Sequence, residues 1–189
     1  MEASTPSSPI EFEIRRIKND DYARLSSFSC GVDSLDRFFQ FEVEECVKNH
    51  YLAAYIAVNQ NDDIIAAFTL MNDALMITSE DDRNDLIQDI SYCKDEFADF
   101  LNLQTSYPAI NIGHLGTAID YQRHAIGRSI IDLVVETFTH YKQAGCQFIT
   151  VDALNNKATT KFYLSNGFSF QTDRDFFATT RRMYRILPL

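Results

Sequence analysis

A strand–helix–strand unit between residues 107 and 153 most restricts the folds open to this chain. Residues Tyr107–Ile119 and Gln147–Ala153 are rich in apolar and β-branched side chains, which is typical of buried strands. Between them, Arg128–Ala144 carries an apolar stripe at helical spacing. Parallel neighbours in a sheet need a long crossover, usually a helix, whereas antiparallel neighbours need only a turn. We therefore expect one parallel strand pair, with Gly145 ending the helix.

The flanking segments predict the rest of a mixed sheet. Residues Tyr51–Asn59 and Ile64–Met71 are β-prone runs joined by a polar turn, which indicates a hairpin, and Ile77 is expected to close another strand. The remaining expected elements are strands over Ile10–Ile17, Phe168–Thr172 and Thr180–Leu187, and helices over Asp33–Asn49, capped by Asp33 or Ser34, and Asn155–Ser165. Together they predict an α/β (α+β) fold with one mostly antiparallel mixed sheet of six to seven strands and helices on both faces.

Length and composition fit one globular domain. The chain has 189 residues, of which 46% are hydrophobic and 23% charged, so it can bury a core without disulfides or metals. We expect a flexible tail over residues 1–9 and a single domain over residues 10–189. No apolar run approaches the roughly 20 residues of a membrane span, and the first residues do not resemble a signal peptide. A cytoplasmic protein without a membrane partner is expected.

The cysteines argue against a metal centre. Cys30, Cys46, Cys93 and Cys146 fit no zinc-binding spacing, and no CxxC pair is present. We expect four reduced thiols and no metal. No GxGxxG follows the first strand, so no nucleotide redox cofactor is expected either.

The charge of the chain is unevenly distributed. The net charge is −10, yet residues 120–189 hold nine basic and six acidic side chains. Residues 80–99 hold eight acidic and two basic side chains, a pattern typical of a solvated face. Phosphate contacts dominate the affinity of proteins for nucleic acids, so the overall charge argues against a nucleic-acid partner. An anionic ligand is expected in the C-terminal part.

The connector between the strand and the helix of the first unit is a candidate anion site. A strand followed by a short turn and a helix points backbone N–H groups and the positive end of the helix dipole at one place. Ala125 and Gly127 are small enough for the backbone to approach a ligand, and Gly127 would tolerate a positive φ. A pyrophosphate would fit there, and tight packing at the start of the helix is the alternative interpretation.

Two motifs resemble the GNAT superfamily of acyl-CoA-dependent N-acyltransferases. The segment 115–128 is similar to motif A, Gln/Arg-x-x-Gly-x-Gly/Ala, in which Gln122 and Gly127 match and Ala125 replaces the first glycine. Further along, Asn156-x-x-Thr159-x-x-Phe162-Tyr163-x-x-Asn166-Gly167-Phe168 is similar to the Asn-x-x-Ala-x-x-Phe-Tyr-x-x-x-Gly-Phe signature of the family. The resemblance covers residues 50–187. It implies the GNAT fold, with a V-shaped split between the two central parallel strands.

The resemblance also implies a cosubstrate and a set of site residues. Acetyl-CoA would enter the split, pair with the strand as an added strand would, and place its pyrophosphate on the turn. The implied cofactor-binding residues are Leu115, Gly116, Thr117, Gln122, Arg123, His124, Ala125, Ile126, Gly127, Arg128, Ser129 and Asn156, with Asn155 as the alternative to the last. Tyr163 would be the catalytic residue, which protonates the departing thiolate as a general acid.

The base that deprotonates the amine stays open. His114 lies on the expected central strand and titrates in the right range, but a histidine packed in the sheet is an equal alternative. His124 is either a cation in the phosphate turn or a surface residue. Cys30 is expected to be a buried thiol and not a nucleophile, because no partner base is identifiable.

The leading functional prediction is an N-acetyltransferase that transfers an acetyl group from acetyl-CoA to a primary amine of a small cationic molecule or peptide. The alternatives are a toxin-type enzyme acting on aminoacyl-tRNA and a non-catalytic CoA-binding module. The segment Phe28–Phe39 resembles a branch that contains tRNA-acetylating toxins, and a basic cluster favours the same alternative: Arg174, Arg181, Arg182 and Arg185. The expected partners are acetyl-CoA and an amine acceptor, with tRNA and a homodimer left open.

Overall fold

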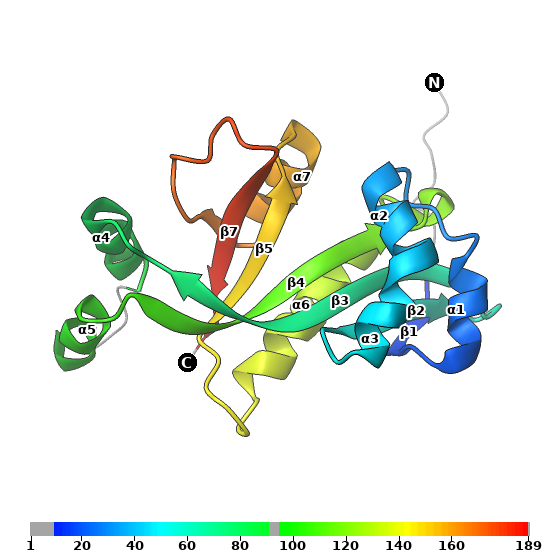
Figure 1. The fold of residues 1–189 in the computed structure, drawn as a ribbon, viewed down its shortest axis with the longest axis horizontal. Coiled ribbons are helices and arrows are strands. Elements are labelled where there is room, and N and C mark those ends of the chain that lie inside the picture. The colour runs from blue at the N-terminus through cyan, green and yellow to red at the C-terminus, as the bar shows by residue number, and fades with distance from the viewer. Residues whose placement is uncertain (1–9, 91–94, 189) are drawn as a thin grey trace. The chain divides into compact units, whose positions relative to one another are not determined.

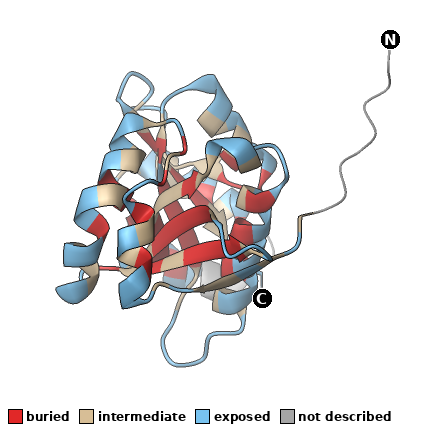
Figure 2. Ribbon diagram, turned by 90° about the vertical axis from the view of Figure 1, so that its right-hand side faces the viewer, coloured by how far each residue is buried: buried red, intermediate tan, exposed pale blue. Residues whose placement is uncertain are grey.

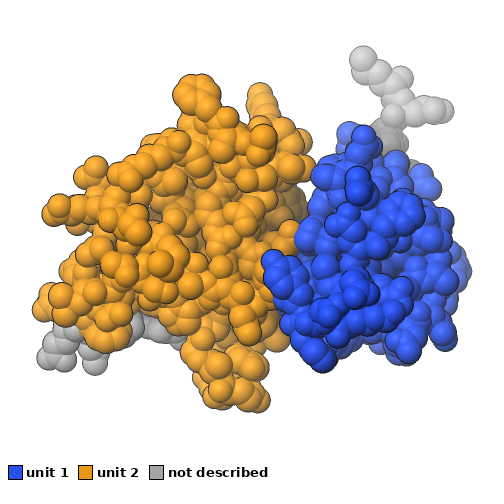
Figure 3. Space-filling view, viewed as in Figure 1, with its two compact units in different colours: residues 1–70, 114–130 blue, residues 71–113, 131–189 orange. Residues whose placement is uncertain are grey.

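The computed structural model of the chain describes residues 10–90 and 95–188, and for Asp95–Ala98 it describes only the backbone. The tail expected over residues 1–9 and the thiol of Cys93 lie outside the described residues. The chain divides into two compact units, shown in Figure 3: unit 1 comprises residues 1–70 and 114–130, and unit 2 comprises residues 71–113 and 131–189. Because each unit takes in two separate stretches, the expectation of a single domain over residues 10–189 stays a prediction.

A single seven-stranded sheet of order β1-β2-β3-β4-β5-β7-β6 organises the fold (Figure 1). Its strands are β1 (Phe12–Arg16), β2 (Ala53–Asn59), β3 (Ile64–Met76), β4 (Ser106–Thr117), β5 (Phe148–Leu154), β6 (Ser169–Phe170) and β7 (Thr180–Ile186). β4 and β5 are parallel, and the pairs β1–β2, β2–β3, β5–β7 and β6–β7 are antiparallel. The predicted mixed sheet and its parallel pair are confirmed. Ile77 does not close a separate strand, because β3 runs on without a break to Met76.

The helices are α1 (Asn19–Leu25), α2 (Asp33–Arg37), α3 (Val43–Lys48), α4 (Glu80–Asp89), α5 (Asp95–Asn102), α6 (Ile126–Thr139) and α7 (Lys157–Ser165). Figure 1 shows α1, α2 and α3 in front of the strands of unit 1, and α6 behind β4. The helix expected over Asp33–Asn49 is interrupted by a π-helical segment, Phe38–Glu42, and its N-cap is Val32, so the caps predicted at Asp33 and Ser34 are wrong. Gly145 ends no helix, because α6 stops at Thr139.

Buried side chains concentrate on the strands and on the inward faces of the helices (Figure 2). In unit 1, Phe38 and Phe39 of the π-helical segment are both buried, with Phe39 packed edge-on against Phe28. In unit 2, a cluster that includes Tyr107, Phe148 and Tyr184 forms the core. The apolar side chains of the predicted strands therefore form most of the core, because their burial removes apolar surface from water.

Of the acidic segment predicted over residues 80–99, the described residues form α4 and the start of α5. Ser79 caps α4, because its Oγ accepts the amide of Asp82 at 3.1 Å. Leu86, Ile90 and Leu101 anchor this region in the core of unit 2, each 2% exposed or less. The acidic residues of the first turn suit the positive end of the helix dipole.

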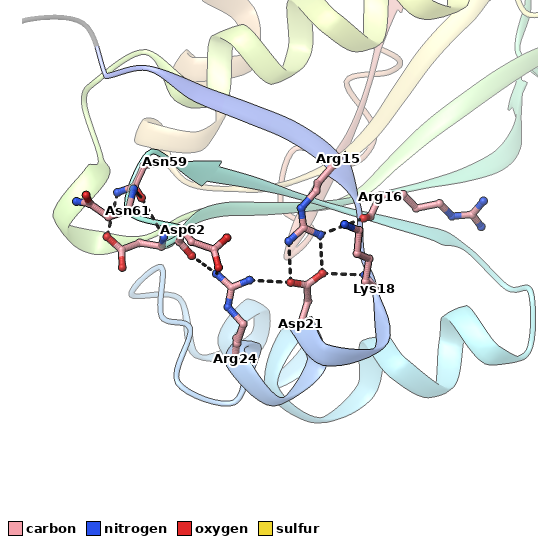
Figure 4. Close-up of polar contacts among 9 residues, drawn as sticks. Arg15, Arg16, Lys18, Asp21, Arg24, Asn59, Asn61 and Asp62 are labelled. Carbon is pink, nitrogen blue, oxygen red and sulfur yellow. Dashed lines mark hydrogen bonds and ion pairs between the residues drawn. The ribbon is translucent and has the colours of Figure 1, made fainter.

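A buried carboxylate connects β1 to α1 in unit 1 (Figure 4). Asp21 is 2% exposed and accepts two hydrogen bonds from the guanidinium of Arg15, at 2.6 and 2.9 Å, and one from Arg24 at 2.8 Å. The amide of Lys18 donates to the same carboxylate at 2.8 Å, which satisfies a donor at the start of α1. The hydrogen bonds from Arg15 lower the pKa of Asp21 from 3.8 to about 2, against the opposing effect of burial.

Substitution of Asp21 by Asn is expected to destabilise the protein at neutral pH. The lowered pKa means that the ionised carboxylate contributes about 2 kcal/mol above pH 4, and that this contribution is lost as the pH falls toward 2. Urea unfolding of the wild type and of Asp21→Asn over a pH series tests this. The difference in unfolding free energy should shrink on acidification. Asp20→Asn, an exposed neighbour on the same helix, should change stability far less, and a pH-independent difference for Asp21→Asn would contradict the assignment.

Candidate active site

The central parallel pair of strands separates soon after it forms. β4 and β5 pair only through Ala109–Asn111 and Phe148–Thr150 in the described chain, although β4 continues to Thr117 and β5 to Leu154. β5 stays paired with β7 along its whole length. Backbone groups that lose a strand partner need another partner. The parallel pairing of β4 with β5 predicted from the sequence is thereby confirmed, and its register among the described residues ends at Asn111 and Thr150.

A polar network in unit 2 lies at the point where the pairing ends. Asn111 is 4% exposed, and its Nδ2 donates to Oγ1 of Thr150 at 3.2 Å. The hydroxyl of Thr150 donates in turn to Asp73, which is ion-paired with Arg182. Arg182 also donates to Asp152 at 2.8 Å. Sequence reasoning missed this network, although polar residues inside otherwise apolar strands were the available signal.

The turn between β4 and α6 belongs to unit 1, and its backbone differs from the prediction. Arg123 has φ 66° and Ala125 has φ 60°, while Gly127 lies in the first turn of α6 and needs no positive φ. The turn therefore has its positive φ angles at Arg123 and Ala125, and not at Gly127, where a positive φ was expected to be tolerated. Ala125, which replaces a glycine of the resembling motif, adopts the left-handed conformation that glycine favours.

Gln122 fixes this turn to the rest of unit 1. Its Nε2 donates to the carbonyl of Cys30 at 2.8 Å and to that of Thr117 at 3.1 Å. A Cβ on Gly116 would lie 3.2 Å from Sγ of Cys30, so the glycine of β4 allows this close approach. The side-chain amide of Gln122 therefore positions the turn, and the cofactor contact expected from it stays a prediction.

The start of α6 offers part of the donor set that was predicted. Helices leave their first backbone N–H groups without partners inside the helix, which leaves Ile126 and Gly127 suited to an anion. The amide of Ser129 donates to the carbonyl of Ala125 at 3.0 Å, and its side chain is exposed. The cofactor contact predicted for Ser129 stays a prediction. His124 is exposed, with Nδ1 2.9 Å from the carbonyl oxygen of Gln122. The predictions for Leu115, Arg123 and Arg128 stay predictions.

In unit 2, α7 carries Tyr163 and follows its N-cap residue, Asn156. Oδ1 of Asn156 accepts the amide of Thr159 at 2.9 Å, so this residue caps the helix, and its role toward a cofactor stays a prediction. Tyr163 is 8% exposed and packs edge-on against Phe168, with ring centres 5.2 Å apart. Its hydroxyl makes no hydrogen bond to the described residues, and burial raises its pKa. The phenol is therefore protonated at neutral pH, and among the described residues nothing accepts its proton.

Asn155, the alternative to Asn156, is committed elsewhere. Its Nδ2 donates to the carbonyls of Phe176 and Ala178, at 2.8 Å each. Both amide hydrogens are thus used to hold the loop between β6 and β7. This arrangement leaves Asn156 as the better candidate of the two.

The predicted base and nucleophile candidates are both altered by burial. The ring of His114 stacks on Phe38 with centroids 3.4 Å apart, and Nδ1 lies 3.1 Å from Oγ1 of Thr69. Burial lowers the pKa of His114 to about 4, so the neutral ring is a weak base at pH 7. Burial also raises the pKa of the Cys30 thiol to about 11, with Asp36 adding to the effect. Cys30 is the unreactive buried thiol that was expected.

Two further features concern the described residues only. They contain no group of three or more histidine, cysteine or acidic residues placed to hold a metal ion. None of their helices is long and apolar enough to cross a membrane.

Replacement of Ala125 by Gly is expected to stabilise the protein, because it relieves a left-handed residue that costs roughly 1–2 kcal/mol. The glycine also loses more entropy on folding, so the expected net gain is about 0.5–1 kcal/mol. Chemical unfolding measures it. Ala23→Gly, at an exposed position of α1 in the same unit, is the matched control and should cost about 1 kcal/mol. A loss of stability in Ala125→Gly would contradict the strain.

Comparisons with known proteins bear on the fold. No family model and no curated protein sequence matches this chain. Its structure is similar to that of a tyrosine-to-phenylalanine mutant of KacT, with a TM-score of 0.71 and 17% identity, covering 93% of this chain and 95% of that one. It is also similar to a tyrosine-to-phenylalanine mutant of the toxin AtaT bound to the C-terminus of the antitoxin AtaR and acetyl-CoA, with a TM-score of 0.69 and 17% identity, covering 93% of each chain.

A third solved structure is AtaT complexed with acetyl-methionyl-tRNAfMet, with a TM-score of 0.70 and 18% identity, covering 91% of this chain and 94% of that one. At this level of identity, the likeness concerns the fold. The mixed seven-stranded sheet, the central strands that separate after a short parallel pairing, and the turn that leads from β4 into α6 agree with it. The chain therefore has the GNAT fold.

Proposed function

We propose that this protein is an acetyl-CoA-dependent N-acetyltransferase whose acceptor is the amino group of an aminoacyl-tRNA. The observation that carries the proposal is the early separation of β4 and β5, which leaves strand edges for a ligand, followed by a turn that leads into the start of α6. Solved structures with the same fold that contain acetyl-CoA or an acetylated aminoacyl-tRNA support the choice of donor and acceptor.

The proposed donor site uses backbone groups more than side chains. The pantetheine arm would pair with Leu115, Gly116 and Thr117 as an added strand does. The pyrophosphate would lie on the turn after Gln122, where the amides of Ile126 and Gly127 and the helix dipole favour negative charge. Small residues permit this approach, so a bulky or acidic side chain at Gly127 is incompatible with it.

The proposed reaction is direct attack of a neutral amine on the thioester carbonyl. A C–N bond forms, the C–S bond breaks, and the sulfur leaves with the electron pair of that bond. Tyr163 donates its phenolic proton to the thiolate. The amine nitrogen loses one proton, which restores the phenol through the surrounding water, so one proton leaves the nitrogen and one reaches the sulfur. The free hydroxyl of Tyr163 supports this role, because no neighbour in the described chain competes for its proton.

The charges of the chain bear on the acceptor. The overall charge of −10 favours the small cationic amine that the sequence first suggested, and the acidic first turn of α4 favours it too. The arginine cluster that favoured tRNA is smaller than expected, because Arg181 is 5% exposed and bound to Asp175 at 2.8 Å, and Arg182 is bound to Asp73 and Asp152. The small amine is therefore retained as the second candidate.

An acetyl-transfer assay separates the candidates. The purified protein is incubated with radiolabelled acetyl-CoA and either a set of aminoacyl-tRNAs or a panel of polyamines, aminoglycosides and lysine peptides. Label that is recovered as N-acetyl-aminoacyl-tRNA supports the proposal. Transfer confined to free amines overturns the choice of acceptor. Tight binding of acetyl-CoA without transfer to any acceptor favours the non-catalytic module.

Substitution of Gly127 by Glu is expected to abolish acetyl-CoA binding, because it brings bulk and negative charge against the phosphates. Isothermal titration calorimetry with acetyl-CoA measures the affinity, and circular dichroism checks the fold. Gly127→Ala adds only a methyl group at a helical position and is the matched control. Unchanged affinity in a folded Gly127→Glu protein would contradict the phosphate site.

Replacement of Tyr163 by Phe keeps the ring and removes only the hydroxyl. If Tyr163 is the general acid, kcat should fall about 100-fold, the usual scale for acid–base catalysis, with acetyl-CoA affinity almost unchanged. Steady-state kinetics with the acceptor identified above, together with a pre-steady-state measurement, tests this for the chemical step. Tyr141→Phe, at an exposed tyrosine just after α6, should have wild-type kcat. A wild-type rate of the chemical step in Tyr163→Phe would assign the ring a packing role only.

A further inference from the structure

The loop between β6 and β7 presents two exposed aromatic rings. Phe177 is 95% exposed and Phe176 is 57% exposed, and their ring centroids lie 5.0 Å apart in an edge-to-face pair. Exposed single apolar residues are common on proteins, but two adjacent phenylalanines at a loop tip cost solvation free energy. Such a cost is more readily explained by a ligand than by packing.

The loop that carries these rings is held firmly by unit 2. Arg181 is buried beneath it, donating to Asp175 and to the carbonyl of Thr172 at 2.8 Å each, with its guanidinium 3.8 Å from the centre of the Phe170 ring. Asp175 also accepts the amide of Arg182 at 2.8 Å. A loop with this many internal partners presents its outward side chains in a fixed geometry, which reduces the entropy lost on binding.

The same loop is tied to the helix that carries Tyr163. Asn155 directly precedes the N-cap of α7 and donates to the carbonyls of Phe176 and Ala178. The backbone amide of Asn155 also donates to the carbonyl of Thr179 at 2.9 Å. The exposed rings are therefore positioned by residues that adjoin α7, within one compact unit.

The charge of the C-terminal sequence that contains the loop favours an anionic partner. Residues 154–189 hold six basic and two acidic side chains, in contrast to the strongly acidic remainder of the chain. After Arg181 and Arg182 are set aside as internally bonded, the exposed cations are Lys157, Lys161 and Arg174, against one exposed acid, Asp173. Aromatic rings flanked by cations bind single-stranded nucleic acids, because bases stack on the rings while the cations contact phosphates.

We propose that Phe177, supported by Phe176, is a stacking platform for the unpaired nucleotides at the 3′ end of an RNA acceptor, with Lys157, Lys161 and Arg174 contacting its phosphates. This inference rests on the proposed function and names the part of the RNA that unit 2 contacts. An unpaired end offers base faces that a duplex hides within its stack. The platform therefore distinguishes an acceptor with a single-stranded 3′ end from a blunt duplex.

Fluorescence anisotropy tests the platform with two labelled RNA hairpins, one with a single-stranded 3′ overhang and one blunt. Phe177→Ala and Phe177→Leu should each weaken binding of the overhang hairpin about 10-fold, the scale of one lost stacking contact. Phe177→Trp should bind as tightly as the wild type or more tightly. Binding of the blunt hairpin should not change. Phe41→Ala removes a ring that is 73% exposed in unit 1 and is the matched control, with no expected effect.

Three results would overturn the platform. The first is wild-type affinity in Phe177→Ala. The second is wild-type affinity in Phe177→Leu, which would show that an apolar side chain without a ring suffices. The third is an equal loss of affinity for both hairpins. Loss of a dimer in Phe177→Ala during analytical ultracentrifugation, with RNA binding unchanged, would assign the rings to a second copy instead.

The assay also separates this inference from the proposed function. Phe177-dependent binding of the overhang without acetyl transfer to aminoacyl-tRNA supports the platform and overturns the acceptor. Acetyl transfer to aminoacyl-tRNA at an unchanged kcat/KM in Phe177→Ala supports the acceptor and overturns the platform. Acetyl-CoA affinity should be the same in all Phe177 variants, because the substitution lies outside the turn that would hold the pyrophosphate.

Discussion

The brief pairing of two parallel strands is the constraint on which the rest of this structure depends. Among the described residues, the register between β4 and β5 covers three residue pairs, although β4 continues to Thr117 and β5 to Leu154. Folded proteins rarely leave polar groups without a partner or solvent. Two hydrogen bonds lie where this register ends, and they join Asn111 to Thr150 and Thr150 to Asp73. Without these bonds, the burial of the polar side chains would cost free energy.

Burial decides which of the chemically attractive side chains can take part in a reaction. His114 and Cys30 were candidates by residue type, yet desolvation disfavours the charged form of each, which makes the histidine a weak base and the thiol a poor nucleophile. The same effect on Tyr163 has the opposite consequence, because a phenol that resists ionisation keeps the proton that a leaving group needs. The direction of a pKa shift thus supports one role and weakens two others. None of these directions follows from residue type alone.

The elements with strong periodicity could be read from the sequence, and the exceptions have physical causes. The strands and α6 follow from apolar patterning. The start of α1 does not, because its N-cap residue, Lys18, is not a typical capping residue. The Lys18 amide instead donates to the side chain of Asp21, which lies inside the helix. The π-helical segment was missed because the apolar spacing of this region fits an ordinary helix; in the structure its Phe38 and Phe39 contact the distant residues His114 and Phe28. Similarly, the sequence shows four arginines near its C-terminal end but not that Arg181 lies beneath a loop. The left-handed φ of Ala125 could not be predicted from an alanine, and only the glycine at this position of the resembling motif hints at it.

The two edges of the sheet have a consequence for self-association. β6, at one edge, spans only Ser169–Phe170, and β1, at the other, carries Arg15 and Arg16. Short or charged edge strands are the means by which proteins prevent their sheets from pairing with other sheets. The guanidinium of Arg15 is also committed to Asp21, so a strand that approached β1 would have to pass a fixed charge cluster. Continuous sheets that run from one copy of this chain into the next are therefore disfavoured at both edges.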